Sequence, residues 1–256
     1  MMKHFLAEAK RIVCDAGMMA KEILPPSRVL RPKKHGGPVT EGDIRVEKYV
    51  ICELKKQFPD HGFDSEERGQ ENTDAECVWI LDPIDGTGYY VRDVPLYSVS
   101  LALERNKELV LGVVYMPELD RIYCAIAGQC ATMNDRKIHC SDEVHLSQAS
   151  IFLEIPSGTS STAEQQWALE KMSTLIQKVY RVRIMGVGSL GLCFCATGGF
   201  DAYVNLGTMW KRHDIAAGQV IVREAGGEFS YLGKRGRNIV AGPAALCSEI
   251  QELINL

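Results

Sequence analysis

The sequence lacks the features that mark several specialised classes of protein. No apolar run approaches the ~20 residues of a membrane-spanning helix, and no GxxxxGK[ST] phosphate-binding loop is present. Basic residues are not in excess, because 29 Lys and Arg stand against 33 Asp and Glu. A protein that binds nucleic acid directly usually presents a basic face. We therefore expect neither a membrane partner nor a direct nucleic-acid partner.

Nine cysteines are present, but they lack the pattern of a disulfide scaffold or of a zinc site. Their number is odd, no CxxC pair occurs, and most of them lie in apolar stretches. The close pair Cys193 and Cys195 has no second pair of soft ligands nearby. The N-terminus lacks a basic segment followed by a long apolar one, so we expect no signal peptide. Free thiols in the reducing cytoplasm fit these observations best.

The composition, with 46% apolar residues and a net charge of −4, is that of a folded chain. Its 256 residues fit one large α/β domain or two tightly joined lobes. In the first half, helices over 4–24 and 40–58 precede a meander of short strands between 78 and 126. In the second half, strands over 151–155, 181–185 and 202–206 alternate with helices over 161–179, 189–197 and 214–225. We expect a layered α/β (α+β) fold, formed by one domain over 1–256 with lobes at 1–145 and 146–256.

Periodicity, prolines and glycines define these elements. The strands predicted in the meander are 78–81, 97–103, 110–115 and 122–126. The segment 31–39 is basic, rich in glycine and bounded by proline, which indicates an exposed loop. Thr40 and Asp43 approximate a capping box at the start of the second helix.

The most informative motif is Asp82-Pro83-x-Asp85-Gly86-Thr87, which follows the apolar run Trp79–Leu81. Two carboxylates at the end of one strand suit a hard divalent cation, because Mg²⁺ prefers oxygen ligands. If a helical turn begins at Gly86–Thr87, its free N–H groups would face an anion such as phosphate. The same residues are also ordinary turn formers, so an unremarkable β-turn explains the motif equally well on its own.

Further acidic residues stand at other predicted element boundaries. Glu66 and Glu67 lie in a polar loop before the strand, while Asp43 and Asp214 stand near the starts of two helices. Each helix-start aspartate has an alternative role as a helix cap. Taken one at a time, these residues favour a structural role.

Taken together, the motifs resemble those of the inositol monophosphatase superfamily, which are Mg²⁺-dependent, lithium-sensitive phosphatases. The matching segments occur in family order between residues 33 and 227 and cover most of the chain. They are Pro38-Val39-Thr40-x-x-Asp43, Glu66-Glu67, Trp79–Thr87, Cys195–Tyr203 and His213–Gly218 with Glu224–Gly227. The resemblance implies an αβαβα sandwich of the sugar-phosphatase type, a homodimer and two or three Mg²⁺ ions in each active site.

The resemblance assigns ligands to the first two ions. Glu66, Asp82 and the carbonyl oxygen of Ile84 are implied ligands of the first Mg²⁺. Asp82, Asp85 and Asp214 are implied ligands of the second. Carboxylates brought together in this way would repel one another, and bound cations would offset that charge and keep them ionised.

Further roles follow from the same resemblance. Glu66, with Asp43 acting through water, is implied to support a third and more weakly held ion. Thr87 and Glu67 would orient or activate the attacking water, and the metal ions would lower the pKa of that water. Direct attack by this water needs no covalent enzyme intermediate. Asp85 joins them as a catalytic residue.

Substrate contacts are also implied. Gly86 and Thr87 would donate backbone N–H bonds to phosphate, Asp214 would border the substrate, and Lys33 resembles a family lysine that approaches the site. Gly186 and Gly188 belong to the stretch that lines the sugar site in the family.

The sequence departs from the family pattern where the leaving group binds. Asn205 replaces a glutamate that contacts inositol hydroxyls, and His213 replaces a tryptophan before Asp214, as a substrate contact or, slightly favoured, as a packing residue. The segment from Gly207 to Asp214 is about two residues longer than in animal inositol phosphatases. The metal-binding motifs are therefore kept while the leaving-group pocket is altered.

We therefore predict a Mg²⁺-dependent phosphomonoesterase that acts on a small-molecule phosphoester. Inositol monophosphate is the expected substrate. Rival substrates within the superfamily are 3′-phosphoadenosine 5′-phosphate, fructose 1,6-bisphosphate, NADP and histidinol phosphate. A different class is a protein-binding regulator of RNA polymerase or of ribosomal-RNA processing, as some bacterial members are thought to be. Because the chain is slightly acidic, such a role would have to be mediated by protein contacts.

Overall fold

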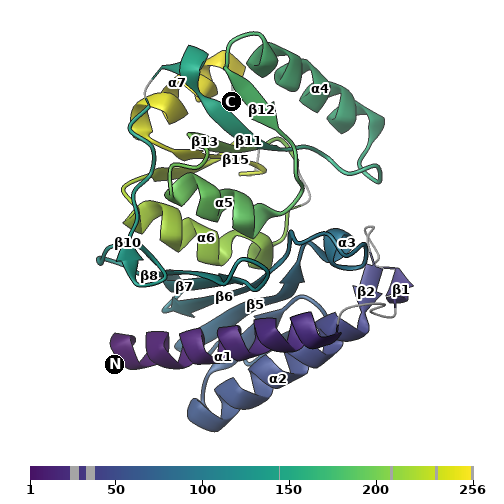
Figure 1. Cartoon of the computed structure of the whole chain (residues 1–256), viewed down its shortest axis with the longest axis vertical. Coiled ribbons are helices and arrows are strands. Elements are labelled where there is room, and N and C mark those ends of the chain that lie inside the picture. The colour runs from purple at the N-terminus through teal and green to yellow at the C-terminus, as the bar shows by residue number, and fades with distance from the viewer. Residues whose placement is uncertain (24–28, 33–37, 144, 208–209, 234–235, 255–256) are drawn as a thin grey trace.

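Five layers of helices and sheets are stacked in the computed structural model of the chain, which describes residues 1–23, 29–32, 38–143, 145–207, 210–233 and 236–254 (Figure 1). Helices α1 and α2 form the first layer, and an eight-stranded sheet the second. Helices α5 and α6 lie between this sheet and a five-stranded sheet, and α4 and α7 form the outer layer beyond it. This arrangement confirms the predicted layered αβαβα fold.

The helices of the described ranges agree with most of the predicted ones. They are α1 (Met2–Ile23), α2 (Glu41–Gln57), α3 (Thr87–Tyr90), α4 (Thr162–Ile176), α5 (Gly188–Ala196), α6 (Arg212–Glu224), α7 (Ala244–Ile254) and the 3₁₀ turn Leu146–Gln148. None of the helices in the described part of the chain is long and apolar enough to cross a membrane. The nine cysteines are all free thiols, as expected.

The large sheet carries the acidic motif. Its order is β10-β9-β8-β7-β6-β5-β3-β4. The strands are β3 (Gly62–Ser65), β4 (Gly69–Glu71), β5 (Cys77–Asp85), β6 (Ser98–Arg105), β7 (Glu108–Met116), β8 (Arg121–Ile126), β9 (Thr132–Met133) and β10 (Arg136–Lys137). Strands β5 to β8 form the predicted antiparallel meander, whereas β3 pairs parallel to β5. The sequence pattern does not predict β3 or β4, because both are short and polar.

The small sheet has the order β12-β11-β13-β15-β14. Its strands are β11 (Ser150–Glu154), β12 (Arg181–Arg183), β13 (Ala202–Asn205), β14 (Glu228–Leu232) and β15 (Asn238–Gly242). Strand β11 pairs parallel to both β12 and β13, and β15 pairs antiparallel to β13 and β14. The first three strands are predicted from the sequence, whereas β14, β15 and α7 are not.

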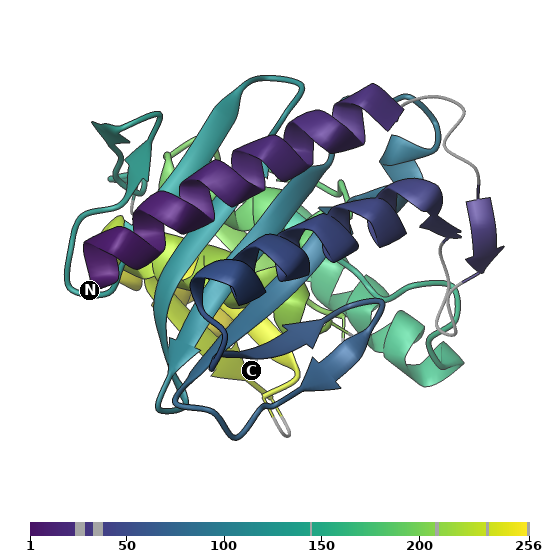
Figure 2. The same ribbon diagram turned by 90° about the horizontal axis from the view of Figure 1, so that it is seen from below.

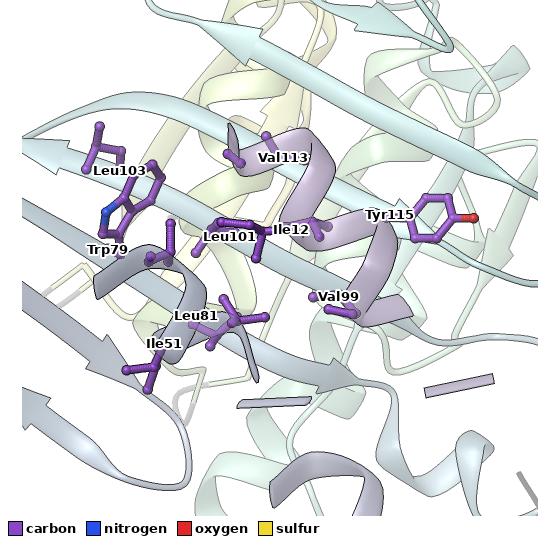
Figure 3. Packing of buried hydrophobic residues seen from close by; sticks show 14 of the residues in the cluster. Ile12, Ile51, Trp79, Leu81, Val99, Leu101, Leu103, Val113 and Tyr115 are labelled. Atoms are coloured by element: carbon purple, nitrogen blue, oxygen red, sulfur yellow. The ribbon is translucent and has the colours of Figure 1, made fainter. Parts of the chain in front are cut away.

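Alternation along the strands divides the apolar residues between two cores. Trp79 and Leu81 of β5 face α1 and α2, while Ile80 faces the middle layer of helices. Figure 3 shows the first core, where β6 supplies Leu101 and α1 supplies Ile12. Because both faces of β5 are covered, all nine of its residues are buried. The strand that ends in the acidic motif is therefore held from both sides.

The outer helices α1 and α2 lie side by side across the large sheet (Figure 2). Thr40 caps α2 with the predicted capping box, in which Thr40 Oγ1 accepts from Asp43 N and Asp43 Oδ2 accepts from Thr40 N. The predicted loop over 31–39 is corrected at its ends, because β1 (Val29–Pro32) and β2 (Pro38–Thr40) pair antiparallel. Residues 33–37 lie outside the described ranges.

Candidate functional site

The end of β5 is shaped by an interruption in its pairing with β6. Asp82 pairs with Ser100 and Asp85 pairs with Ser98. Asp82 and Asp85 therefore have one more residue between them than Ser98 and Ser100 have, so β5 bulges here. Asp82 Oδ1 accepts from Ile84 N at 3.1 Å, which folds the backbone back between the two aspartates. Asp82 and Asp85 are only 2% and 9% exposed. The turn thus holds two nearly buried aspartates, three positions apart, at the end of β5.

Gly86 ends this turn and starts α3. Its φ is +92°, and a Cβ at this position would lie 2.7 Å from the carbonyl oxygen of Leu96. Only glycine meets both conditions without strain, so the motif is more than an ordinary turn. The backbone N–H groups that follow Gly86 open the short helix, as the sequence predicts.

Thr87 connects the motif to α2. Its Oγ1 donates to the carbonyl oxygen of Ile84 at 2.9 Å and lies 3.4 Å from Asp43 Oδ1. Asp43 is fully buried, and its other carboxylate oxygen is engaged by Thr40 in the capping box. Both the capping role and the site role predicted for Asp43 are therefore compatible with its position.

Glu66 and Glu67 follow β3, which runs parallel to β5. They therefore lie at the same end of the strands as Asp82. Glu66 N donates to the carbonyl oxygen of Leu81 at 3.2 Å. The turn is held from below by Glu47 of α2, whose Oε1 accepts from Glu67 N at 3.0 Å. The two glutamates are thereby fixed beside the β5 turn.

Asp85 is held by the N-terminal end of α5. Its Oδ2 accepts from both the backbone N–H and the hydroxyl of Ser189, and Ser189 Oγ lies 2.7 Å from Ser98 Oγ. The helix dipole and the free N–H groups stabilise the ionised carboxylate at this place. The middle layer of helices therefore contacts the acidic turn directly.

Asp214 reaches the same place from α6. The helix begins at Arg212, so Asp214 is its third residue, and its Oδ2 accepts from Lys211 N at 2.8 Å. The predicted start of this helix at Asp214 is thus two residues late. Burial and then the charges of Asp85 and Glu66 raise the pKa of Asp214 to about 7, against the effect of Lys211. Burial disfavours the ionised form of Asp214, and the repulsion expected of converging carboxylates adds to this effect.

Glu66, His213 and Asp214 form a potential metal-binding cluster. One ligand atom from each lies within 4.8 Å of the others, and His213 Nε2 is 3.9 Å from Glu66 Oε1. The ammonium group of Lys211 lies 2.6 Å from Glu66 Oε1. The cluster therefore already contacts one positively charged group. Its possible ligand atoms, carboxylate oxygens and one imidazole nitrogen, suit a divalent cation.

The predicted contacts on the leaving-group side are less uniform. Gly188 borders the site, because a Cβ there would lie 3.3 Å from the Asp214 carbonyl oxygen. Gly186 has a φ of +67° and faces open space. Asn205 is occupied internally, since its Oδ1 accepts from Gly207 N and its Nδ2 donates to Tyr203 Oη. Lys33 lies outside the described residues.

Sequence reasoning does not identify Glu47 or Lys211, and it places Ser189 in the stretch that lines the sugar site without predicting its contact with Asp85. Glu47 lies on the buried stripe of α2 four residues after Asp43, and a charged residue on that stripe is the signal that could have found it. Burial raises the pKa of Glu47, and its contacts with Ser65 Oγ and the amides of Glu67 and Arg68 partly oppose this. Lys211 has no comparable local signal.

The layered fold is that of a family of phosphatases. The sequence matches the model of the inositol monophosphatase family over residues 1–255. The chain belongs to this family and is a phosphatase hydrolase. Members of the family are generally Mg²⁺-dependent.

Individual relatives have different names. An inositol-1-monophosphatase of Mesorhizobium japonicum is 36% identical over 202 residues, covering 78% of this chain and 74% of that protein. The Nus factor SuhB of Pasteurella multocida is 36% identical over 225 residues, covering 85% and 81% respectively. The crystal structure of the extragenic suppressor protein suhB from Bartonella henselae superposes with a TM-score of 0.91 at 27% identity, covering 98% of each chain.

Proposed function

We propose that this protein is a Mg²⁺-dependent phosphomonoesterase that hydrolyses inositol monophosphate to inositol and phosphate. The observation that carries the proposal is the meeting of acidic side chains from β5, the β3 turn and α6 at one sheet edge. The pKa of Asp214 is raised first by burial and then by the charges of Asp85 and Glu66, which supports this convergence. The roles below rest on the family resemblance and on the positions of the side chains.

Two or three Mg²⁺ ions would be held at this edge. Glu66, Asp82 and the Ile84 carbonyl oxygen would hold the first, and Asp82, Asp85 and Asp214 the second. Glu66, together with Asp43 through water, would support a third. When bound, Mg²⁺ offsets the charge of the phosphate, stabilises the leaving alkoxide and lowers the pKa of water.

The chain's own residues would orient the reaction. Thr87 donates its hydroxyl proton in a hydrogen bond to the Ile84 carbonyl oxygen, and Asp43 Oδ1 lies 3.4 Å away, so the Thr87 oxygen can accept a hydrogen bond from the attacking water and orient it. Glu67 would orient the same water from the β3 turn. The N–H groups of Gly86 and Thr87, at the start of α3, would bind phosphate oxygens.

The leaving alcohol would lie between the start of α5 and the small sheet. Gly186 faces open space, and Gly186, Gly188, Asn205, Asp214 and Lys33 are the candidate contacts. We propose that the lobes 1–145 and 146–256 act as one unit, because the site takes residues from both.

The deciding experiment is phosphate release from a panel of phosphoesters, with Mg²⁺, with EDTA and with lithium. The panel includes inositol monophosphate, 3′-phosphoadenosine 5′-phosphate, fructose 1,6-bisphosphate, NADP and histidinol phosphate. We expect inositol monophosphate to be turned over fastest, with loss of activity in EDTA and inhibition by lithium. A preferred nucleotide substrate would overturn only the choice of substrate, whereas no turnover of any ester would overturn the enzyme.

A protein-binding role is a second candidate, because one relative is named as a Nus factor. This chain could then act on RNA polymerase or ribosomal-RNA processing through protein contacts. An Asp214→Asn variant that releases no phosphate but keeps the cellular role would favour this candidate.

A homodimer in the cytoplasm is the remaining part of the proposal. Its mass in solution, measured by light scattering, and the location of a tagged chain in cells would test the two points.

A further inference from the structure

Glu154 is the last residue of β11, and its side chain lies on the face of the small sheet that packs on α5. It is in register with Asn205 in the parallel pair of β11 and β13. Phe152, two residues earlier, packs on Gly191 of α5, where a Cβ would lie 2.6 Å from the Phe152 ring. Because side chains alternate along a strand, Glu154 and Phe152 share this face. Glu154 therefore points into the middle layer, toward α5.

The carboxyl group of Glu154 faces the acidic cluster from the side opposite to β5. Burial and then the charges of Asp85 and Asp214 raise the pKa of Glu154 to about 8, while the backbone N–H of Val187 acts in the opposite direction. Val187 precedes α5, and Ser189 of the same helix donates to Asp85. Glu154 and Asp85 thus approach the same helix end from two sides.

One atom of this carboxyl is left without a partner by the described residues. Oε1 is shielded from solvent, and none of the described polar groups makes a hydrogen bond with it. Its neighbour in register, Asn205, uses its amide for Gly207 N and Tyr203 Oη instead. Buried polar groups almost always have a hydrogen-bond partner, so an isolated one calls for an explanation. A bound molecule would supply the missing partner.

The position of Glu154 indicates which part of a substrate this would be. The phosphate is expected at the β5 turn and the start of α3, and Glu154 stands across the site from them, on β11. Gly188, at the start of α5, lies close to Asp214 and Tyr203, because a Cβ there would be 3.3 Å from the Asp214 carbonyl oxygen and 3.5 Å from Tyr203 Oη. This is the side on which the alcohol portion of the ester would lie.

We propose that Glu154 is a specificity-determining residue that forms a hydrogen bond through Oε1 with a hydroxyl group of the substrate's alcohol portion. This inference rests on the proposed phosphatase function and adds to it the residue that would select an ester with a hydroxyl group beside the phosphate. A carboxyl group can accept from such a hydroxyl or, when protonated, donate to it. An ester without that hydroxyl would leave Oε1 unpaired and would gain nothing from Glu154.

The test compares two esters in the wild type and three variants. Inositol 1-phosphate carries hydroxyls beside the ester, and p-nitrophenyl phosphate carries none. In Glu154→Leu we expect kcat/KM for inositol 1-phosphate to fall about 100-fold, mainly through KM, while p-nitrophenyl phosphate changes less than about 3-fold. Glu154→Gln keeps one acceptor and one donor, so we expect a smaller loss than in Glu154→Leu. Glu228→Gln, an exposed glutamate of β14, serves as the control for lost charge and should match the wild type.

Two further measurements separate this role from others. Mg²⁺ binding by calorimetry should differ less than about 2-fold between Glu154→Gln and wild type, and the Tm without Mg²⁺ should be equal or higher, since repulsion is removed. An equal fall of kcat/KM for both esters, or loss of Mg²⁺ binding, would overturn the inference and leave the phosphatase intact. A wild-type protein that hydrolyses neither ester, nor any other ester of the panel, would overturn the proposed function itself.

Discussion

The candidate site has two walls that are built in different ways. The contiguous wall consists of Asp82, Ile84, Asp85 and Thr87, which lie within six successive residues at the end of one strand. The assembled wall consists of Glu154, Gly188, Lys211 and Asp214, which come from β11 and the starts of α5 and α6. The first is fixed by local backbone geometry, whereas the second depends on how the layers pack.

This difference predicts that substitutions in the two walls have different effects. Substitutions in the contiguous wall should chiefly affect turnover, because its side chains would hold the reacting group. Substitutions in the assembled wall should chiefly affect ion affinity, stability against pH and substrate choice. The following predictions test this difference in order of decreasing expected effect.

Asp82→Asn should lower phosphate release at least about 1,000-fold, because Asp82 would serve two ions and each contributes several kcal/mol. The free energy of unfolding without Mg²⁺ should stay the same or rise, since one repelling charge is removed. Initial rates and urea unfolding in EDTA measure the two effects. The exposed Asp74→Asn is the matched control. A large loss of stability without Mg²⁺ would contradict a metal-binding role.

Glu47→Ala should destabilise the protein by about 2–3 kcal/mol, because the Ser65 hydroxyl and the amides of Glu67 and Arg68 lose their acceptor. Phosphate release should fall by about 10- to 100-fold as the turn that carries Glu66 and Glu67 loosens. Urea unfolding and initial rates give both numbers. Glu47→Gln retains an acceptor oxygen and should restore part of each. Unchanged activity in the alanine variant would show that the turn needs no support from α2.

The stability of the metal-free protein should fall between pH 5 and pH 8, by up to about 1.4 kcal/mol per pH unit for each of two carboxyl groups. Asp214 and Glu154 have pKa values raised to about 7 and about 8 in the folded chain. Their carboxyl groups release protons near pH 4 when unfolded, so between pH 4 and pH 8 the unfolded chain binds fewer protons. Their contribution is therefore complete below about pH 4 and is lost as pH rises through the folded values.

Urea unfolding in EDTA at a series of pH values measures this trend. The slope should be smaller in the double variant Asp214→Asn with Glu154→Gln. Added Mg²⁺ should reduce the fall at pH 8, because bound cations favour the ionised carboxylates. If the double variant showed the same dependence of unfolding free energy on pH as the wild type, groups other than Asp214 and Glu154 would cause the dependence.

Lys211→Met should tighten Mg²⁺ binding by about 3- to 10-fold, because the ammonium 2.6 Å from Glu66 Oε1 competes with the cation. The backbone N–H that bonds Asp214 is unaffected by the change. Titration calorimetry at fixed ionic strength measures the affinity. Lys178→Met removes an exposed lysine and should leave it unchanged. Weaker binding in Lys211→Met would mean that the ammonium organises the site rather than competing for it.

The contiguous wall can be predicted from the sequence because its residues define their own geometry. Gly86 needs its positive φ, and the Asp82 carboxylate bonds the Ile84 amide two residues on, so the motif alone implies the turn. The order of the layers is predictable for the same kind of reason, since periodicity 2 and 3.6 distinguish β5–β8 from the helices.

The assembled wall cannot be predicted in this way. Ser189 meets Asp85 across 104 positions in the sequence, and Lys211 meets Glu66 across 145. Nothing near Glu154 in the sequence marks it, because it ends an ordinary strand. Even for Asp214, which the family pattern identifies, local reasoning misplaces the start of the helix by two residues. Such contacts depend on packing between layers, which the sequence around each residue does not encode.

The close contact between α6 and the large sheet has a consequence for the width of the site. Gly112 of β7 lies so near α6 that a Cβ would be 2.4 Å from the carbonyl oxygen of Ala217. Ala217 is three residues after Asp214 on the same helix, and β7 is two strands from β5 in the sheet that ends at Asp82. The absence of a side chain at Gly112 therefore allows the close packing that sets the distance between Asp214 and Asp82. A metal site can thus be put out of register by a residue that touches neither ion nor substrate.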